Sequence, residues 1–228
     1  MEEHLNTQKH SADEVSEALH FGILLTIIGG FLETYSYVGR GHVFANGQTA
    51  NMAKFGMNLA AGDFPEAVKY LIPIVCFAVG VYLAEVIHTL FQRRRLLHWK
   101  QAVLLLEGGL TLLTAALPGG AGDTAANVVI AIICGLQVEA FRKLHSYAYT
   151  TTMCTGNLRS ATEAFYRFFA LRQPEEGGKA AHYYGIILIF IFSAVLGGLF
   201  TDRFGHPAIL FCLLPIGLCF LLLHRARC

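Results

Sequence analysis

The sequence has few charged residues and many apolar ones. Of its 228 residues, only 14% are Asp, Glu, Lys or Arg, whereas 54% are hydrophobic. A soluble domain usually carries about 25% charged residues, so this deficit excludes an ordinary water-exposed protein. Apolar runs such as residues 183–200 and 208–223 approach the roughly 20 residues that a helix needs to cross a bilayer. We therefore predict an all-α integral membrane protein with the lipid bilayer as its main partner.

Several chemical signatures are also missing. The six cysteines show no C-x-x-C or other metal-ligand spacing, so we expect no metal site. The sequence has no H-E-x-x-H, no phosphate-binding glycine loop and no nucleophile–base pair at a recognisable spacing. We therefore predict no enzyme, no catalytic residue and no cofactor. The net charge of +1 gives no general attraction to nucleic acid.

Six apolar segments predict six transmembrane helices, at residues 20–38, 67–90, 101–117, 124–141, 181–200 and 207–223. Loops rich in Lys and Arg stay in the cytoplasm. Placing the basic loop that contains Arg94 inside leaves 13 of the 17 basic residues on that side. Those outside are Arg40, Lys54, Lys69 and Arg203. Both termini are then cytoplasmic, with residues 1–18 as an N-terminal tail that is too polar for a signal peptide.

An internal repeat divides the chain into two halves, residues 19–118 and residues 119–228 with the short C-terminal tail. Residues 30–55 align without a gap on residues 136–161. Each half contains three spans, an odd number, so the second half must be inverted relative to the first. Inverted three-helix repeats are typical of secondary transporters. The alignment pairs Glu33 with Glu139, Thr49 with Thr155 and Asn51 with Asn157.

A polar segment and a short helical stretch follow the first span of each repeat. The segments are residues 44–50 (FANGQTA) and 150–156 (TTTMCTG), and the helical stretches are residues 51–61 and 157–171. We expect Thr49 and Thr155 to be the N-caps of these helices. Two interpretations remain open. The segments dip into the membrane as re-entrant loops, or each short helix lies on the membrane surface.

The re-entrant interpretation predicts a shared site near the bilayer midplane. Two helix N-termini would approach from opposite faces, and their unpaired N–H groups would favour a solute with an anionic group. The expected substrate-binding residues are Asn46, Thr49, Asn51, Thr155 and Asn157.

Two carboxylates within predicted spans, Glu33 and Glu139, are candidates for proton coupling or ion binding, because ionisable groups are costly in a membrane helix. The alternative is that each pairs with a nearby base, such as Arg40 or Arg142. Glu85 and Glu107 are weaker candidates, and Glu107 is expected within snorkelling reach of the inner face.

The residues that carry this pattern resemble the YoaK family of bacterial inner-membrane proteins. The resemblance covers about residues 18–224, and its clearest element is TTTMCTGNL, residues 150–158. The first motif reads Thr49-Ala50-Asn51, where the family commonly has Thr-Gly-Asn, and Glu139 stands where the family often has Asn. The resemblance implies an inner-membrane location and a six-span topology, and it implies no substrate.

These observations favour a transporter or channel for a small solute. A membrane scaffold or partner subunit without transport is the first alternative, and a membrane enzyme is a weaker one. The chain is small for a transporter, so we also expect that it could act as a homodimer.

Overall fold

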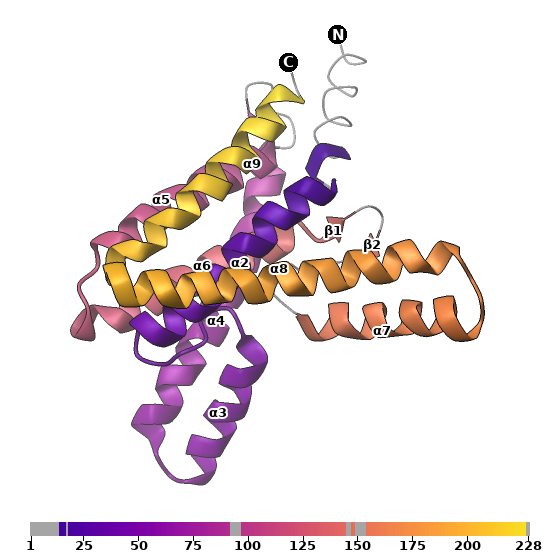
Figure 1. Cartoon of the computed structure of the whole chain (residues 1–228). Helices are drawn as coiled ribbons and strands as arrows, with labels where there is room; N and C mark the ends of the chain where they lie inside the picture. The colour runs from indigo at the N-terminus through magenta and orange to yellow at the C-terminus, as the bar shows by residue number, and fades with distance from the viewer. Residues whose placement is uncertain (1–13, 17, 92–96, 145–146, 149–153, 227–228) are drawn as a thin grey trace.

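The computed structural model describes residues 14–16, 18–91, 97–144, 147–148 and 154–226. Long helices dominate it (Figure 1). The helices that correspond to the six predicted spans are α2 (Leu19–Gly39), α4 (Phe64–Phe91), α5 (Trp99–Ala116), α6 (Asp123–Ala140), α8 (Glu175–Phe204) and α9 (Leu213–Arg225).

Two further helices follow α2 and α6, as the sequence predicts. These are α3 (Gln48–Ala60) and α7 (Cys154–Ala170). Short 3-10 turns, η1 (Gly120–Gly122) and η2 (His206–Cys212), precede α6 and α9. A minimal antiparallel ladder joins β1 (Lys143–Leu144) to β2 (Tyr147–Ala148). The described part of the chain is otherwise helical or looped, which confirms the all-α class.

Five of these elements are long and apolar enough to cross a membrane, judged by length and composition within the described residues. They are α2, α4, η1 with α6, α8, and η2 with α9. The predicted span at residues 101–117 forms helix α5, which is not among the five. Its first half contains the polar residues Lys100, Gln101 and Glu107. The last predicted span begins as the 3-10 turn η2 rather than as an α-helix.

Glycines let two pairs of long helices approach very closely. A Cβ atom placed on Gly197 of α8 would lie 2.7 Å from the carbonyl oxygen of Phe31 on α2, and one on Gly30 would overlap α8 in turn. On α4, a Cβ at Gly80 would lie 3.0 Å from the Cα atom of Gly135 on α6. Such backbone contact between membrane helices is favoured by small residues. The two tight pairs are therefore α2 with α8 and α4 with α6.

The short helices each lie against the long helix that follows them in sequence, α3 against α4 and α7 against α8. These two helical hairpins project in different directions from a central body, and α3 and α7 both begin where their hairpins leave it (Figure 1). In the body, α5 packs against α6 and α9, and α9 also packs against α2. Helices α3 and α7 are thus each held along the long helix of their own hairpin.

A buried arginine fixes one end of the body. Arg40 follows α2 and is completely buried. Its guanidinium donates to the Tyr35 hydroxyl at 3.0 Å and to the carbonyl oxygens of Thr114 and Leu117 at 2.9 and 3.1 Å. It also forms an ion pair of 3.3 Å with Asp123 at the start of α6. We call this the Arg40 end of the body.

The opposite end brings together the start of α5 and the ends of α4 and α6. Lys100 donates to Ser16, just before α2, at 2.7 Å. Glu85 near the end of α4 and Glu139 near the end of α6 line the same pocket as Lys100. We call this the Lys100 end. Lys69 and Ile72, near the start of α4, line a pocket with Arg40 at the other end. Since α4 and α6 both start at the Arg40 end and finish at the Lys100 end, they run parallel.

Candidate functional site

The loop between α2 and α3 folds back onto α2 and surrounds Glu33. The backbone N–H groups of Asn46 and Gly47 donate to the Glu33 carboxylate. Gly47 is in direct contact with this side chain, because a Cβ atom added there would lie 2.6 Å from Glu33 Oε1. The hydroxyl of Ser36, one turn further along α2, accepts a hydrogen bond of 3.2 Å from the N–H of Ala45. A side chain of α2 therefore occupies the N-terminal end of α3.

Two asparagines hold this loop in place. Asn46 donates through Nδ2 to the carbonyl oxygen of Gly29 on α2 at 3.3 Å. Asn51, in the first turn of α3, donates to the carbonyl oxygen of Phe44 at 2.6 Å. Both side chains are buried, with at most 3% of their surface exposed. They use their N–H groups for the fold and leave their oxygen atoms for another partner.

Three buried acceptor oxygens remain around the loop. Glu33 Oε2, Asn46 Oδ1 and Asn51 Oδ1 receive no hydrogen bond from any described residue. A buried acceptor without a donor is unfavourable in an apolar medium. The arrangement therefore suits a molecule that carries N–H or O–H donors or a positive charge.

The second motif approaches the same carboxylate. Cys154, the first residue of α7, interacts electrostatically with Glu33. Asn157, in the first turn of α7, is buried with 3% of its surface exposed, like its counterpart Asn51. Residues 149–153, which include most of the threonine run, lie outside the described residues. The starts of α3 and α7 therefore both lie near Glu33.

The two threonines differ from the expectation. Helix α3 begins at Gln48 with Gly47 as its N-cap, so the prediction of Thr49 as the N-cap is wrong. The chain reaches helical geometry earlier than expected because the Glu33 carboxylate already accepts the N–H of Gly47. Helix α7 begins at Cys154, so Thr155 is likewise inside its helix rather than at its N-cap. Both threonines are exposed.

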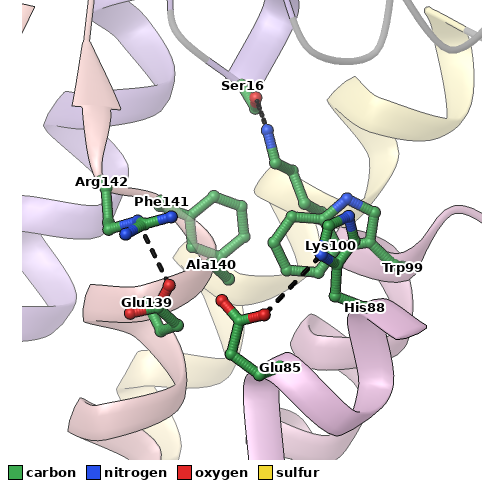
Figure 2. A pocket seen from close by; sticks show the side chains of 9 residues that line it. All are labelled: Ser16, Glu85, His88, Trp99, Lys100, Glu139, Ala140, Phe141 and Arg142. Atoms are coloured by element: carbon green, nitrogen blue, oxygen red, sulfur yellow. Dashed lines mark hydrogen bonds and ion pairs between the residues drawn. The ribbon is translucent and has the colours of Figure 1, made fainter. Parts of the chain in front are cut away.

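Glu139 lies elsewhere, at the Lys100 end. It forms an ion pair of 3.2 Å with Arg142, and its carboxyl group is hydrogen-bonded to that of Glu85. Figure 2 shows these groups around a cavity of about 150 Å³, with Glu85 directed toward His88. Trp99 and Lys100 close another side of the cavity. The local pairing of Glu139 with a base, one of the two alternatives from the sequence, is therefore present.

Arg40 does not pair with Glu33, because its guanidinium is held by Asp123 and by backbone carbonyl groups. The predicted topology counts Arg40 among the basic residues on the outer side of the membrane. Its complete burial could not be predicted from the sequence, because the partners that stabilise it come from α5 and α6, far away in sequence.

The position of Glu107 also differs from the expectation. It is completely buried and does not snorkel to the inner face.

No three His, Cys, Asp or Glu side chains gather to hold a metal ion in the part of the chain that the structure describes. The five cysteines in that part of the chain are free thiols: Cys76, Cys134, Cys154, Cys212 and Cys219.

The fold and this buried polar site define a helical, multi-pass membrane protein. A family model described as "Protein of unknown function (DUF1275)" matches residues 21–222. The chain belongs to this family.

A curated relative supports the same assignment. The chain is 25% identical over 146 residues to UPF0700 transmembrane protein YoaK of Bacillus subtilis (strain 168). The aligned region covers 61% of this chain and 64% of the relative, so the chain spans less than two thirds of the relative's length. The resemblance to the YoaK family is thereby confirmed. No solved structure matches the chain.

Proposed function

We propose that this protein is a transporter or channel that moves a small solute carrying hydrogen-bond donors or a positive charge. The observation that carries the proposal is the group of buried acceptor oxygens on Glu33, Asn46 and Asn51. Near the middle of a bilayer, such acceptors need a partner that water does not supply. A small cation or an amine would meet this need, and Glu33 would balance its charge.

This proposal changes the expected charge of the solute. The preference for an anion was based on unpaired N–H groups at the two helix starts. At α3, the carboxylate of Glu33 already accepts N–H groups of the loop, from Asn46 and Gly47, which leaves mainly oxygen atoms facing the site. The corresponding segment before α7 falls in residues 149–153, outside the described residues, so an anion at that helix start stays a prediction.

The proposed mechanism uses two inverted repeats that meet at Glu33. The helix contacts support this arrangement, because they keep the same pattern when the halves are exchanged. The counterparts in the two halves are α2 and α6, α3 and α7, α4 and α8, and α5 and α9. Exchanging counterparts converts the contact of α2 with α8 into that of α6 with α4, and the contact of α3 with α4 into that of α7 with α8. It likewise converts the contact of α5 with α6 into that of α9 with α2. Transporters with such repeats bind their solutes where the halves meet and open alternately to the two sides.

Successive long helices run in opposite directions between the two ends of the body, which supports six membrane crossings with both termini on one side. Helix α2 runs from the Lys100 end to the Arg40 end, and α4 and α6 return in the opposite direction. Tyr35 near the end of α2 donates to the carbonyl oxygen of His206 at 2.8 Å, which places the start of η2 and α9 at the Arg40 end. In this proposal α5 is the sixth crossing, with its polar residues Gln101 and Glu107 buried and with Leu105, Leu112 and Leu113 exposed on its outer face.

The re-entrant interpretation follows for α3 and α7. Each begins beside Glu33, inside the body, and runs outward along its partner helix. The pocket that contains Glu139 and Glu85 would then be the cytoplasmic entrance for a charged solute, and Glu139 keeps its proposed part in ion coupling.

A flux screen tests the proposed function. Purified protein in proteoliposomes is assayed with monovalent cations, small amines, polyols and small anions. The proposal expects uptake of a cation or an amine, lost in Asn51→Leu and in Asn157→Leu. Asn58→Leu, at an outer position of α3, is the matched control and should keep wild-type flux. Uptake of anions alone would contradict the proposed solute, and no uptake of any solute would favour the scaffold alternative.

A further inference from the structure

A second buried carboxyl group lies deep in the body. Glu107 is in the middle of α5, and its side chain has no exposed surface. Neither carboxyl oxygen receives a hydrogen bond from any described residue. The hydroxyl of Thr111, one turn further along, donates to the backbone oxygen of Glu107 at 2.8 Å rather than to its carboxyl group. Glu107 is therefore a polar group surrounded by the core.

The neighbours of Glu107 are thiols and apolar side chains. Cys134 of α6 and Cys219 of α9 interact electrostatically with it. They come from two helices packed against α5, and Cys134 also interacts electrostatically with Cys212 of η2. On the same helix, Val103 and Leu104 are also buried. No described Lys, Arg or His forms an ion pair with Glu107.

These surroundings decide what Glu107 can bind. An ionised carboxylate without a counter-charge is strongly disfavoured in such a medium, whereas the neutral acid is tolerated. A metal cation would require several oxygen ligands, and no such group of side chains is present in the described residues around Glu107. The ligand that remains is a proton.

We propose that Glu107 is a proton-binding site in the membrane interior, where its carboxyl group holds a proton at neutral pH while the body stays folded. Cys134 of α6 lies within electrostatic range of both Glu107 and Glu33. The proton-binding site itself does not depend on the proposed transport function.

Infrared difference spectroscopy of the full chain in lipid tests this proposal. Wild-type protein should give the carbonyl band of a protonated carboxylic acid at neutral pH, and exchange into D2O should shift that band. The band should be lost in Glu107→Gln, whose side chain has nearly the same shape as the neutral acid. Glu163→Gln, which removes an exposed carboxylate paired with Arg167, should retain it. Absence of the band in wild-type protein, its persistence in Glu107→Gln, or a band that D2O does not shift would overturn the proposal.

A chemical measurement on the wild-type chain covers the case in which Glu107→Gln fails to fold. A hydrophobic carbodiimide adds to a protonated carboxyl group. The acid proton moves to a carbodiimide nitrogen, the carboxyl oxygen bonds to the central carbon, and rearrangement gives a stable N-acylurea that retains all atoms. Mass spectrometry of the labelled protein should locate this adduct on Glu107. Labelling of other carboxyl groups with Glu107 unmodified would contradict the proposal.

Discussion

The carboxylate of Glu33 accepts the backbone N–H of Gly47, so a side chain of α2 occupies the start of α3. This contact places a negative charge where the helix start would otherwise attract an anion. The buried oxygens beside it, on Asn46 and Asn51, add acceptors to the same place. The electrostatic interaction of Glu33 with Cys154 extends the site to the second repeat.

Arg40 should be essential for stability rather than for solute selection. Replacing it by alanine removes the ion pair with Asp123 and leaves buried carbonyl oxygens without donors. The free energy of unfolding should fall by about 3–5 kcal/mol, the usual cost of breaking a buried pair. Thermal unfolding in detergent measures this loss. Lys69→Ala, which removes an exposed pair with Glu66, is the control and should change little. Equal stability of the two variants would contradict the structural role of Arg40.

The contact between α4 and α6 should not tolerate a methyl group. Gly135→Ala would place its Cβ atom into the backbone of Phe77 and Val81, with a loss of about 1–3 kcal/mol. Gly185→Ala in α8 is the matched control, because no atom lies within 4 Å of the added Cβ. It should be neutral or slightly stabilising, since alanine favours helices more than glycine does. If both variants melt at the same temperature, the close helix approach is wrong.

The convergence of the two short helices can be tested by cross-linking. In a chain whose other cysteines are replaced, Gln48→Cys should be joined to the native Cys154 by a short bismaleimide. These positions begin α3 and α7. Asn58→Cys, near the other end of α3, should not react with Cys154, because the helix rises about 1.5 Å per residue. Gel mobility after reaction measures the link, and equal cross-linking at both positions would argue against a common site.

The orientation of the chain gives a separate prediction. Ala121 and Arg225 are exposed positions at opposite ends of the body in the proposed topology. A membrane-impermeant thiol reagent added to intact cells should label Ala121→Cys in a cysteine-free chain. Arg225→Cys should react after the membrane is made permeable and not before. The reverse pattern would place both termini outside.

The sequence predicted the helices well because their apolar length and their polar breaks are local properties. The short helical stretches at residues 51–61 and 157–171 appear as α3 and α7 with small shifts at their ends. Arg93, Arg94 and Arg95, which contributed to the predicted orientation, lie outside the described residues, so the orientation stays a prediction.

The contacts within the site could not be predicted in the same way. Gly47 became the N-cap in place of Thr49 because of a contact with Glu33 on another helix. Similarly, nothing near Glu107 in the sequence indicates complete burial, which results from the packing of α5 against α6 and α9. Local patterns identify which residues are polar, but the partners that decide their roles come from distant segments.

The most direct test of the site is a comparison of solute currents on solid-supported membranes carrying wild-type protein or Glu33→Gln. Glutamine preserves the size of the side chain and can still accept the N–H of Gly47, so the fold should be retained. It removes the negative charge and turns one acceptor into a donor. Losing a charged hydrogen bond to the solute costs about 1.5–3 kcal/mol, which predicts a fall in current of roughly tenfold or more. Glu163→Gln on the exposed face of α7 should keep the wild-type current. A current in Glu33→Gln equal to that of wild-type protein would contradict the assignment of Glu33 as the centre of the transport site.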